Sequence, residues 1–370
     1  MKITSVELYL FDIPLPNPLA NPITSGASIA TILAVVRTDK GITGQGYGWT
    51  IGSQRAKFIT GATEVAAQFA LGRDPTRMDA IWSDYEAFSN FVGTSGLATM
   101  GMSILDIAFW DIACRAQNLP LWRMLGGHKD KARMYLNLIS ADASGKAPTD
   151  ELHRAFEAGW ASGYRDFKAR MGLNPPMVDA DRVRSLVESM DGKGQLAIDI
   201  AQRWGTVESA KACYEMDDIG LMWIEDPLHQ DNYDGMRNLV ESLDTPICTG
   251  ENAYGVRGPV RIMDEIGCPY VMLDLERCGG ITGWRKAAAV AETRSVRMTT
   301  HVYPHIGVHL VCGTPAATIG EYLPWWDDLL GGPIAVKDGY AVPGEAPGVG
   351  AEVASSWFPR AVWKNIIKQA

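Results

Sequence analysis

Eight short β-rich runs recur after residue 130 of this 370-residue chain, and each is followed by a helical stretch. The first run spans residues 132–140 and the last spans residues 317–323. Between the runs, segments such as "VDADRVRSLVESM" carry apolar residues at helical spacing. Alternating strands and helices are typical of a parallel sheet. Eight such units over roughly 200 residues predict an α/β fold, a (β/α)8 barrel of the TIM type, which usually takes about 250 residues.

An ionisable residue stands at or near the C-terminal end of every run from the second onward. These residues are Lys168, Asp199, Glu225, Glu251, Asp274, His301 and Glu321. Neighbouring members lie 20 to 31 residues apart, which is about the length of one βα unit. For any single acid the default interpretation is a surface or helix-capping role. Seven in phase instead predict a ring at the mouth where barrel enzymes carry their chemistry.

Three acids of this ring, Asp199, Glu225 and Glu251, come from consecutive strands. Three carboxylates held together in a protein repel one another unless a cation lies between them. Hard carboxylate oxygens suit Mg²⁺, and no Cys or His at these strand ends favours zinc. The pattern therefore predicts one Mg²⁺ ion per active site, with coordination positions left for a substrate oxygen.

The rest of the ring supplies a base and two cations. Asp274 next to His301 can fix the tautomer of the imidazole and raise its basicity, which gives a general base. Lys168 and Arg170 are two residues apart in one strand, so their side chains share a face. A base, a metal and facing cations suit removal of the proton α to a carboxylate, because they hold the developing enediolate.

The residues before the barrel have a different pattern. Two segments, "TSVELYLFDI" and "ATILAVVRTD", alternate apolar and polar residues like strands, whereas residues 60–122 have helical spacing. The stretch "DKGITGQGYG" contains G-x-G without a following helix pattern, so we predict a hairpin turn and not a nucleotide site. We predict an α+β domain over residues 1–127 and a catalytic barrel over residues 128–345.

Composition argues against several classes of partner. The net charge of −9 gives no indication of nucleic-acid or anionic-membrane binding. Six scattered cysteines lack the spacing of a disulfide framework or zinc site and are typical of a reduced, cytoplasmic protein. The sequence contains no uninterrupted apolar stretch of 18 or more residues, so we predict no membrane span. We expect a homo-oligomer that acts on a small-molecule carboxylate.

The segment "HVYPHIGVH" spaces His301, His305 and His309 four residues apart, as in a zinc-binding helix. Pro304 near the predicted helix start places His301 before the helix, at the end of a strand. No HExxH-type acid accompanies these residues, so a zinc site is disfavoured. His305 stays a candidate substrate contact.

The ordered set of motifs resembles the enolase superfamily and, within it, the mandelate racemase subgroup. The matching motifs are "KAR", "DIAQRW", "WIEDP", "TGEN", "LDLERCGGITGW", "TTH" and "GEYL". In addition, "SGLATMGMSILDIAFWDIACRAQNLPLWRMLGG" resembles the end of the family's N-terminal capping domain. The resemblance covers essentially the whole chain, and its strength lies in the order and spacing of the motifs.

The resemblance implies a role for each member of the ring. The three acids on consecutive strands would bind Mg²⁺. Lys168 would contact the substrate carboxylate, and Glu321 would donate a hydrogen bond to its other oxygen. The Asp274–His301 pair would be one acid/base catalyst, and the position of Arg170 would hold the second base on the opposite face of the substrate.

The resemblance also implies that the N-terminal domain caps the barrel mouth. Loops near residues 17–28 and 45–52 would set specificity, with Thr24 and Trp49 as candidate contacts. The C-terminal segment, residues 346–370, would return to pack on the capping domain. The remaining candidate substrate contacts are Gln202, Asn252 and His305.

Two positions depart from the subgroup's pattern. Arg170 replaces the usual second Lys, and a guanidinium with a pKa above about 12 is a poor base at neutral pH. Ala201 stands where the subgroup often has Asn, so a substrate hydrogen bond is lost there or supplied by Gln202 or a loop.

One competent base and several donors favour an acid-sugar dehydratase, which would yield a 2-keto-3-deoxy acid. A racemase or epimerase of a 2-hydroxy acid needs a base on each face, so Arg170 would have to release a proton. A cycloisomerase of a sugar-acid lactone needs one base and stays open. A non-catalytic relative is the fourth alternative, which the complete metal triad and dyad disfavour.

Overall fold

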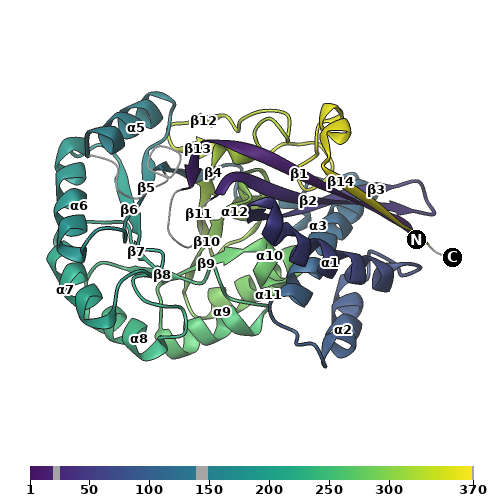
Figure 1. Cartoon of the computed structure of the whole chain (residues 1–370), viewed down its shortest axis with the longest axis horizontal. Coiled ribbons are helices and arrows are strands. Elements are labelled where there is room, and N and C mark those ends of the chain that lie inside the picture. Colours follow the sequence, from purple (N-terminus) through teal and green to yellow (C-terminus); the bar gives the residue numbers. More distant parts are fainter. Residues whose placement is uncertain (20–25, 139–148, 369–370) are drawn as a thin grey trace.

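The computed structural model describes residues 1–19, 26–138 and 149–368 (Figure 1). Its N-terminal part is a four-stranded antiparallel sheet in the order β14-β1-β2-β3. The strands are β1 (Ile3–Leu19), β2 (Gly26–Thr38), β3 (Thr43–Ile51) and β14 (Trp363–Lys368). Three helices accompany the sheet: α1 (Ser53–Ala70), α2 (Met78–Ser89) and α3 (Leu97–Gln117). Because β14 pairs with β1, the C-terminal end of the chain returns to the N-terminal sheet.

The central part is a closed barrel of eight parallel strands, as predicted. They are β4 (Ala132–Asn137), β5 (Asp166–Arg170), β6 (Gln195–Asp199), β7 (Ile224–Glu225), β8 (Ile247–Thr249), β9 (Tyr270–Asp274), β10 (Arg297–His301) and β11 (Ala317–Tyr322). The barrel closes where β11 pairs with β4. A short hairpin, β12 (Val336–Lys337) and β13 (Tyr340–Ala341), extends the sheet antiparallel to β4.

Helices surround the barrel strands (Figure 1). They are α5 (Thr149–Ala161), α6 (Pro176–Met190), α7 (Thr206–Met216), α8 (Tyr233–Ser242), α9 (Arg257–Arg261), α10 (Leu275–Cys278), α11 (Gly280–Thr293) and α12 (Pro304–Gly313). A short helix, α4 (Leu121–Met124), links the two parts. The barrel interior is packed with apolar and aromatic side chains, including Tyr135, Trp223 and Met272. These side chains form a solid floor beneath the strand ends, as is usual for this fold.

The alternating glycines of β3 bring the strand against α3. A Cβ at Gly44 would lie 2.3 Å from the carbonyl oxygen of Ala108, and one at Gly46 would lie 2.2 Å from that of Ile104. The G-x-G pattern therefore serves close packing of helix and sheet. The predicted hairpin is confirmed, since β2 and β3 pair antiparallel. The expected loop at residues 45–52 is wrong, because β3 continues to Ile51.

Helix α3 belongs to the N-terminal, capping part and faces the barrel. It packs against α1 and β3 of the capping part and against α10 and α11 of the barrel. It is long and apolar enough to cross a membrane, but 89% of its apolar window is buried within the protein. Its buried Asp106 accepts hydrogen bonds from Trp82 Nε1 (2.8 Å), Thr282 N (3.0 Å) and Thr282 Oγ1 (2.6 Å). Because Thr282 lies in the first turn of α11, Asp106 anchors the start of α11 to α3.

Candidate active site

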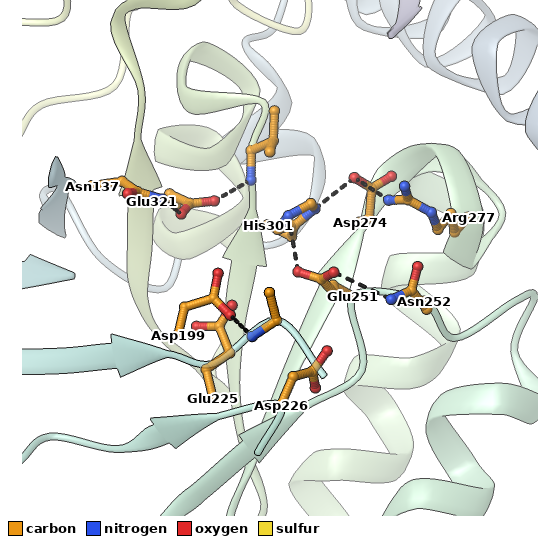
Figure 2. Close-up of polar contacts among 12 residues, drawn as sticks. Asn137, Asp199, Glu225, Asp226, Glu251, Asn252, Asp274, Arg277, His301 and Glu321 are labelled. Atoms are coloured by element: carbon orange, nitrogen blue, oxygen red, sulfur yellow. Dashed lines mark hydrogen bonds and ion pairs between the residues drawn. The ribbon is translucent and has the colours of Figure 1, made fainter. Parts of the chain in front are cut away.

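The strand ends bring the acids and the histidine of the predicted ring together at one mouth of the barrel (Figure 2), and Lys168 joins them through its ion pairs with Glu225 and Glu321. In the strand register, Arg170 is level with Asp199, and Asp199 is level with Glu225. His301 is level with Asp274 in the same way. Parallel strands that end together present their last side chains to one space, so spacing along the sequence becomes proximity in the barrel.

Lys168 lies one layer deeper than Arg170 and is 2% exposed. Its ammonium Nζ is 2.9 Å from Glu225 Oε1 and 2.8 Å from Glu321 Oε1. Burial lowers the pKa of Lys168, but the charges of Glu225 and Glu321 outweigh burial and raise it well above its ordinary value. Lys168 is therefore a fixed cation that holds two buried carboxylates together, and it is not a base in this arrangement.

Arg170 follows Lys168 on the same face of β5 and is partly buried. Its Nε is enclosed and has no hydrogen-bond partner in the described part of the chain. A buried donor without a partner costs about 1–3 kcal/mol, so such a donor often serves a ligand. Burial raises the pKa of Asp199, and the charge of Arg170 partly opposes this rise, behind the larger opposing effect of Lys168.

His301 and Asp274 form the predicted acid/base dyad. His301 Nδ1 lies 2.8 Å from Asp274 Oδ2, and Arg277 lies 3.0 Å from the same oxygen. The backbone N–H of Glu276 donates to Asp274 Oδ1 at 2.8 Å. Burial raises the pKa of Asp274, but Arg277 and the His301 hydrogen bond together bring it below its ordinary value. Asp274 is thus an ionised carboxylate that directs His301 Nε2 toward the ring.

His301 Nε2 lies 3.2 Å from Glu251 Oε2. Burial lowers the pKa of His301, but Glu251 and Asp274 outweigh burial and raise it to about 9. The charge of Glu251 contributes most to this rise, so a cation bound to Glu251 would reduce it and bring His301 toward the neutral pH range in which a general base works best.

Glu321 is fully buried and accepts hydrogen bonds through both carboxylate oxygens. Oε1 accepts from Asn137 Nδ2 at 2.8 Å, and Oε2 accepts from the backbone N–H of Val302 at 2.6 Å. Burial raises its pKa, but the charges of Lys168 and His301 bring it below its ordinary value. Glu321 is therefore an acceptor here, and the donor role implied by the family resemblance requires a proton that these surroundings disfavour.

The three predicted metal ligands offer carboxylate oxygens, which suit a divalent cation, from neighbouring strands of the barrel. Burial raises the pKa of Asp199 and Glu225, and repulsion from Glu251 adds to that effect. This excess of negative charge on adjacent strand ends is what a divalent cation neutralises. Across residues 1–19, 26–138 and 149–368, no three such side chains already form a cluster at ligand distances. Glu225 is turned to Lys168 and Glu251 to His301, so metal binding would rearrange these contacts.

Trp49, at the end of β3, lies beside the base. Its ring centroid is 6.1 Å from that of His301 and 5.7 Å from that of Trp325. Its indole Nε1 is enclosed and has no hydrogen-bond partner within the described structure. Trp49 and Trp325 form an aromatic wall next to His301.

Gln202 and Asn252, two other predicted substrate contacts, have different hydrogen-bond partners. The side-chain amide of Gln202 is bonded at both ends, to Asp226 Oδ2 (3.0 Å) and to the backbone N–H of Gln230 (2.9 Å). Asn252 donates to Glu251 Oε1 at 3.2 Å and so adjoins the metal triad. The amide of Gln202 is thus engaged by two groups of the protein, whereas Asn252 contacts a member of the ring directly.

His305 lies apart from the ring residues. His305 Nε2 lies 3.0 Å from the carbonyl oxygen of Gly332. It lines a separate cavity of about 420 Å³ whose walls include no member of the ring. Thr24 lies outside the described residues.

Two ring partners escaped the sequence reasoning. Asn137, at the end of β4, bonds Glu321, and Arg277 pairs with Asp274. A polar side chain at the end of the first β-rich run was the available signal for Asn137. For Arg277 the signal was the i, i+3 spacing from Asp274 in "LDLERC", which places both residues on one side of a helical turn.

Left-handed backbone conformations gather directly after the ring residues. Positive φ angles occur at Ala201 (51°), Gln202 (61°), Asp226 (43°), Val302 (58°) and Tyr303 (51°). Such conformations cost on the order of 1–3 kcal/mol each for non-glycine residues and cluster at functional sites. Asn tolerates this region better than Ala does. The residue type that the subgroup often has at position 201 therefore also fits the backbone better than Ala201.

Comparisons with known proteins agree with this geometry. The family described as enolase C-terminal domain-like matches residues 151–357, and the mandelate racemase / muconate lactonizing enzyme N-terminal domain matches residues 5–126. L-talarate/galactarate dehydratase from Salmonella typhimurium is 26% identical, over 96% of this chain and 91% of that protein. 3,6-anhydro-alpha-L-galactonate cycloisomerase from Streptomyces coelicolor is 29% identical, over 94% and 96%.

A solved structure adds the same fold with a metal. The Salmonella typhimurium L-talarate/galactarate dehydratase liganded with Mg and L-lyxarohydroxamate has a TM-score of 0.92 at 25% identity. That match covers 100% of this chain and 95% of the other. Relatives of this kind are named as dehydratases, cycloisomerases and epimerases. The chain therefore belongs to the mandelate racemase / muconate lactonizing enzyme family of the enolase superfamily, and it is an enzyme with lyase or isomerase activity.

Proposed function

We propose that the chain is a Mg²⁺-dependent acid-sugar dehydratase. The observation that carries the proposal is an asymmetry between two strand ends. Strand β10 ends at His301, which is oriented by an ionised Asp274, and β5 ends at Arg170, where the family resemblance implies a second base that is usually Lys. Of the two, only the imidazole can both take up and release a proton, because a guanidinium stays protonated. Relatives named as talarate/galactarate and D-xylonate dehydratases support this class of substrate.

In this proposal His301 Nε2 takes the proton from C2 of the acid sugar. The C2–H electrons form the C2=C3 double bond as the C3–O bond breaks, and the proton on His301 can pass to the leaving hydroxyl as water. The resulting enol tautomerises to a 2-keto-3-deoxy acid. Lys168 provides fixed positive charge beneath the substrate carboxylate, and Arg170 can hold a hydroxyl or carboxylate through its fork of donors.

The metal belongs to this proposal as one Mg²⁺ per site, held by Asp199, Glu225 and Glu251. When bound, it supplies positive charge beside the substrate carboxylate, which stabilises the charge that develops on proton removal. Asn252, which donates to Glu251, would orient that ligand.

Incubation with mono- and diacid sugars, with Mg²⁺ or with EDTA, tests the proposal. We expect at least one of them to give a 2-keto-3-deoxy acid, detected by NMR, in the Mg²⁺ sample alone. A control with Asp199→Asn in Mg²⁺ should give no product. Conversion of a sugar-acid lactone to an isomeric open-chain keto acid without loss of water, with no conversion of the open-chain acids, would instead support the cycloisomerase alternative, which also needs a single base and has a cycloisomerase relative at 29% identity.

Arg170→Lys tests the one-base interpretation directly. If Arg170 binds substrate, turnover should fall by roughly tenfold to a hundredfold, because the bidentate donor fork is lost. A lysine there could also act as a second base, and slow exchange of the C2 proton of the opposite epimer in D₂O would report that role. Arg170→Gln separates the two effects, since Gln can donate a hydrogen bond but cannot act as a base. Undiminished turnover in both variants would contradict a substrate-binding role.

A further inference from the structure

We infer that Glu276 is a positioning residue that fixes the indole of Trp49 against His301. This inference deepens the proposed function and rests on it for the kinetic part of its test. Glu276 belongs to α10, directly after Asp274, whereas Trp49 belongs to the capping sheet. The contact therefore joins the N-terminal sheet to the helix that begins directly after Asp274, one member of the proposed catalytic dyad.

The geometry of β3 makes this contact necessary. β3 stands last in the sheet order β14-β1-β2-β3, so one of its edges lacks a neighbouring strand. Buried N–H groups at such an edge need acceptors from elsewhere. Two buried carboxylates supply them: Asp111 accepts from Gln45 N at 3.0 Å, and Glu276 accepts from Trp49 N at 3.1 Å. Of these two carboxylates, Asp111 belongs to α3 in the capping part, whereas Glu276 belongs to the barrel.

The position of Glu276 is tightly determined. Its side chain is fully buried, and a Cβ at Gly48 would lie 2.8 Å from its Oε1. Burial raises the pKa of Glu276 to about 8, and the negative charge of Asp274 adds to that effect. A mainly neutral carboxylic acid needs no counter-ion in this site, so an amide of the same shape should replace it.

The contacts that hold Asp274 differ from the contact between Glu276 and Trp49, so a mutation can remove the second and leave the first. Asp274 is held by Arg277 and by the backbone N–H of Glu276, neither of which depends on the Glu276 carboxyl group. The Glu276 carboxyl group accepts from the backbone N–H of Trp49, whose strand also pairs with β2 at Thr31. Loss of the carboxyl group should therefore loosen the free edge of β3 at Trp49 and shift its indole, while the dyad stays in place.

Fluorine NMR of protein labelled with 5-fluorotryptophan tests the inference without a substrate. Trp49→Phe identifies the Trp49 signal among those of the 12 tryptophans. We expect Glu276→Leu and the shorter Glu276→Asp to shift or broaden that signal, and Glu276→Gln to retain it. Asp111→Asn is the matched control on the same strand edge and should leave the signal in place. An unchanged Trp49 signal in folded Glu276→Leu or Glu276→Asp would overturn the inference.

Kinetics with galactarate and Mg²⁺ then measure the consequence for the reaction. We expect Glu276→Asp to raise KM about tenfold with kcat changed less than threefold, and Glu276→Gln to restore KM. A fall in kcat at constant KM would show that Glu276 acts on the dyad and not through Trp49, which overturns the inference. If no acid sugar is converted by the parent protein, the proposed function fails, and the fluorine signal still decides the position of Trp49.

Discussion

Replacement of His301 by Asn is expected to reduce acid-sugar turnover by at least about 10³-fold, since general-base catalysis contributes roughly 10²–10⁴. Asn can still donate to Asp274, so the buried carboxylate keeps a partner and the fold should survive. The variant should also fail to exchange the C2 proton with solvent, because Arg170 cannot replace the base.

His229→Asn is the matched control for this substitution. His229 is exposed on the segment after β7, with 65% of its side chain accessible, so the same change there should leave kcat/KM within twofold. Both variants are compared by single-turnover kinetics and by circular dichroism. Activity of His301→Asn within tenfold of the parent would exclude His301 as the base.

Replacement of Lys168 by Met is expected to have the largest effect on stability. Lys168 is buried between Glu225 and Glu321, and the loss of one partner of a buried ion pair typically costs about 3–5 kcal/mol. In EDTA the two carboxylates would face each other without the ammonium, so the melting temperature should fall by roughly 5–10 °C. Turnover should also be lost, since the cation beneath the substrate carboxylate is gone.

Magnesium should reduce this loss of stability without removing it. A metal held by the strand-end acids compensates the charge of Glu225, whereas Glu321 remains without its cation. Lys193→Met is the control, because Lys193 is 44% exposed and its pairing with Glu157 at 3.6 Å is worth little. Equal melting temperatures for Lys168→Met and the parent in EDTA would contradict the ion-pair arrangement.

The barrel and its ring could be predicted because both follow from repetition along the chain. Strand length and helix spacing recur with the βα unit, so residues such as Asp199 and Glu225 fall at equivalent strand ends. A closed parallel barrel places equivalent strand ends side by side, so residues that are regularly spaced in the sequence lie close together in space. The burial of α3 at the junction with the barrel likewise agrees with its helical spacing of apolar residues.

What could not be predicted depends on contacts between distant segments. Asn137 bonds Glu321, which lies 184 positions away in the sequence, and the Trp49–Glu276 contact joins residues 227 positions apart. The state of Glu321 also depends on its surroundings, because Lys168 and His301 keep it ionised. The glycines of β3 resembled a loop in sequence but serve close packing on α3.

The most direct test of one-base chemistry is turnover of an acid sugar in D₂O, followed by NMR of both product and remaining substrate. The account predicts a 2-keto-3-deoxy acid with deuterium at C3 and no inversion at C2 of the remaining substrate. Deuterium at C2 with inversion, and no elimination, would show a base on each face and contradict the account in favour of epimerisation.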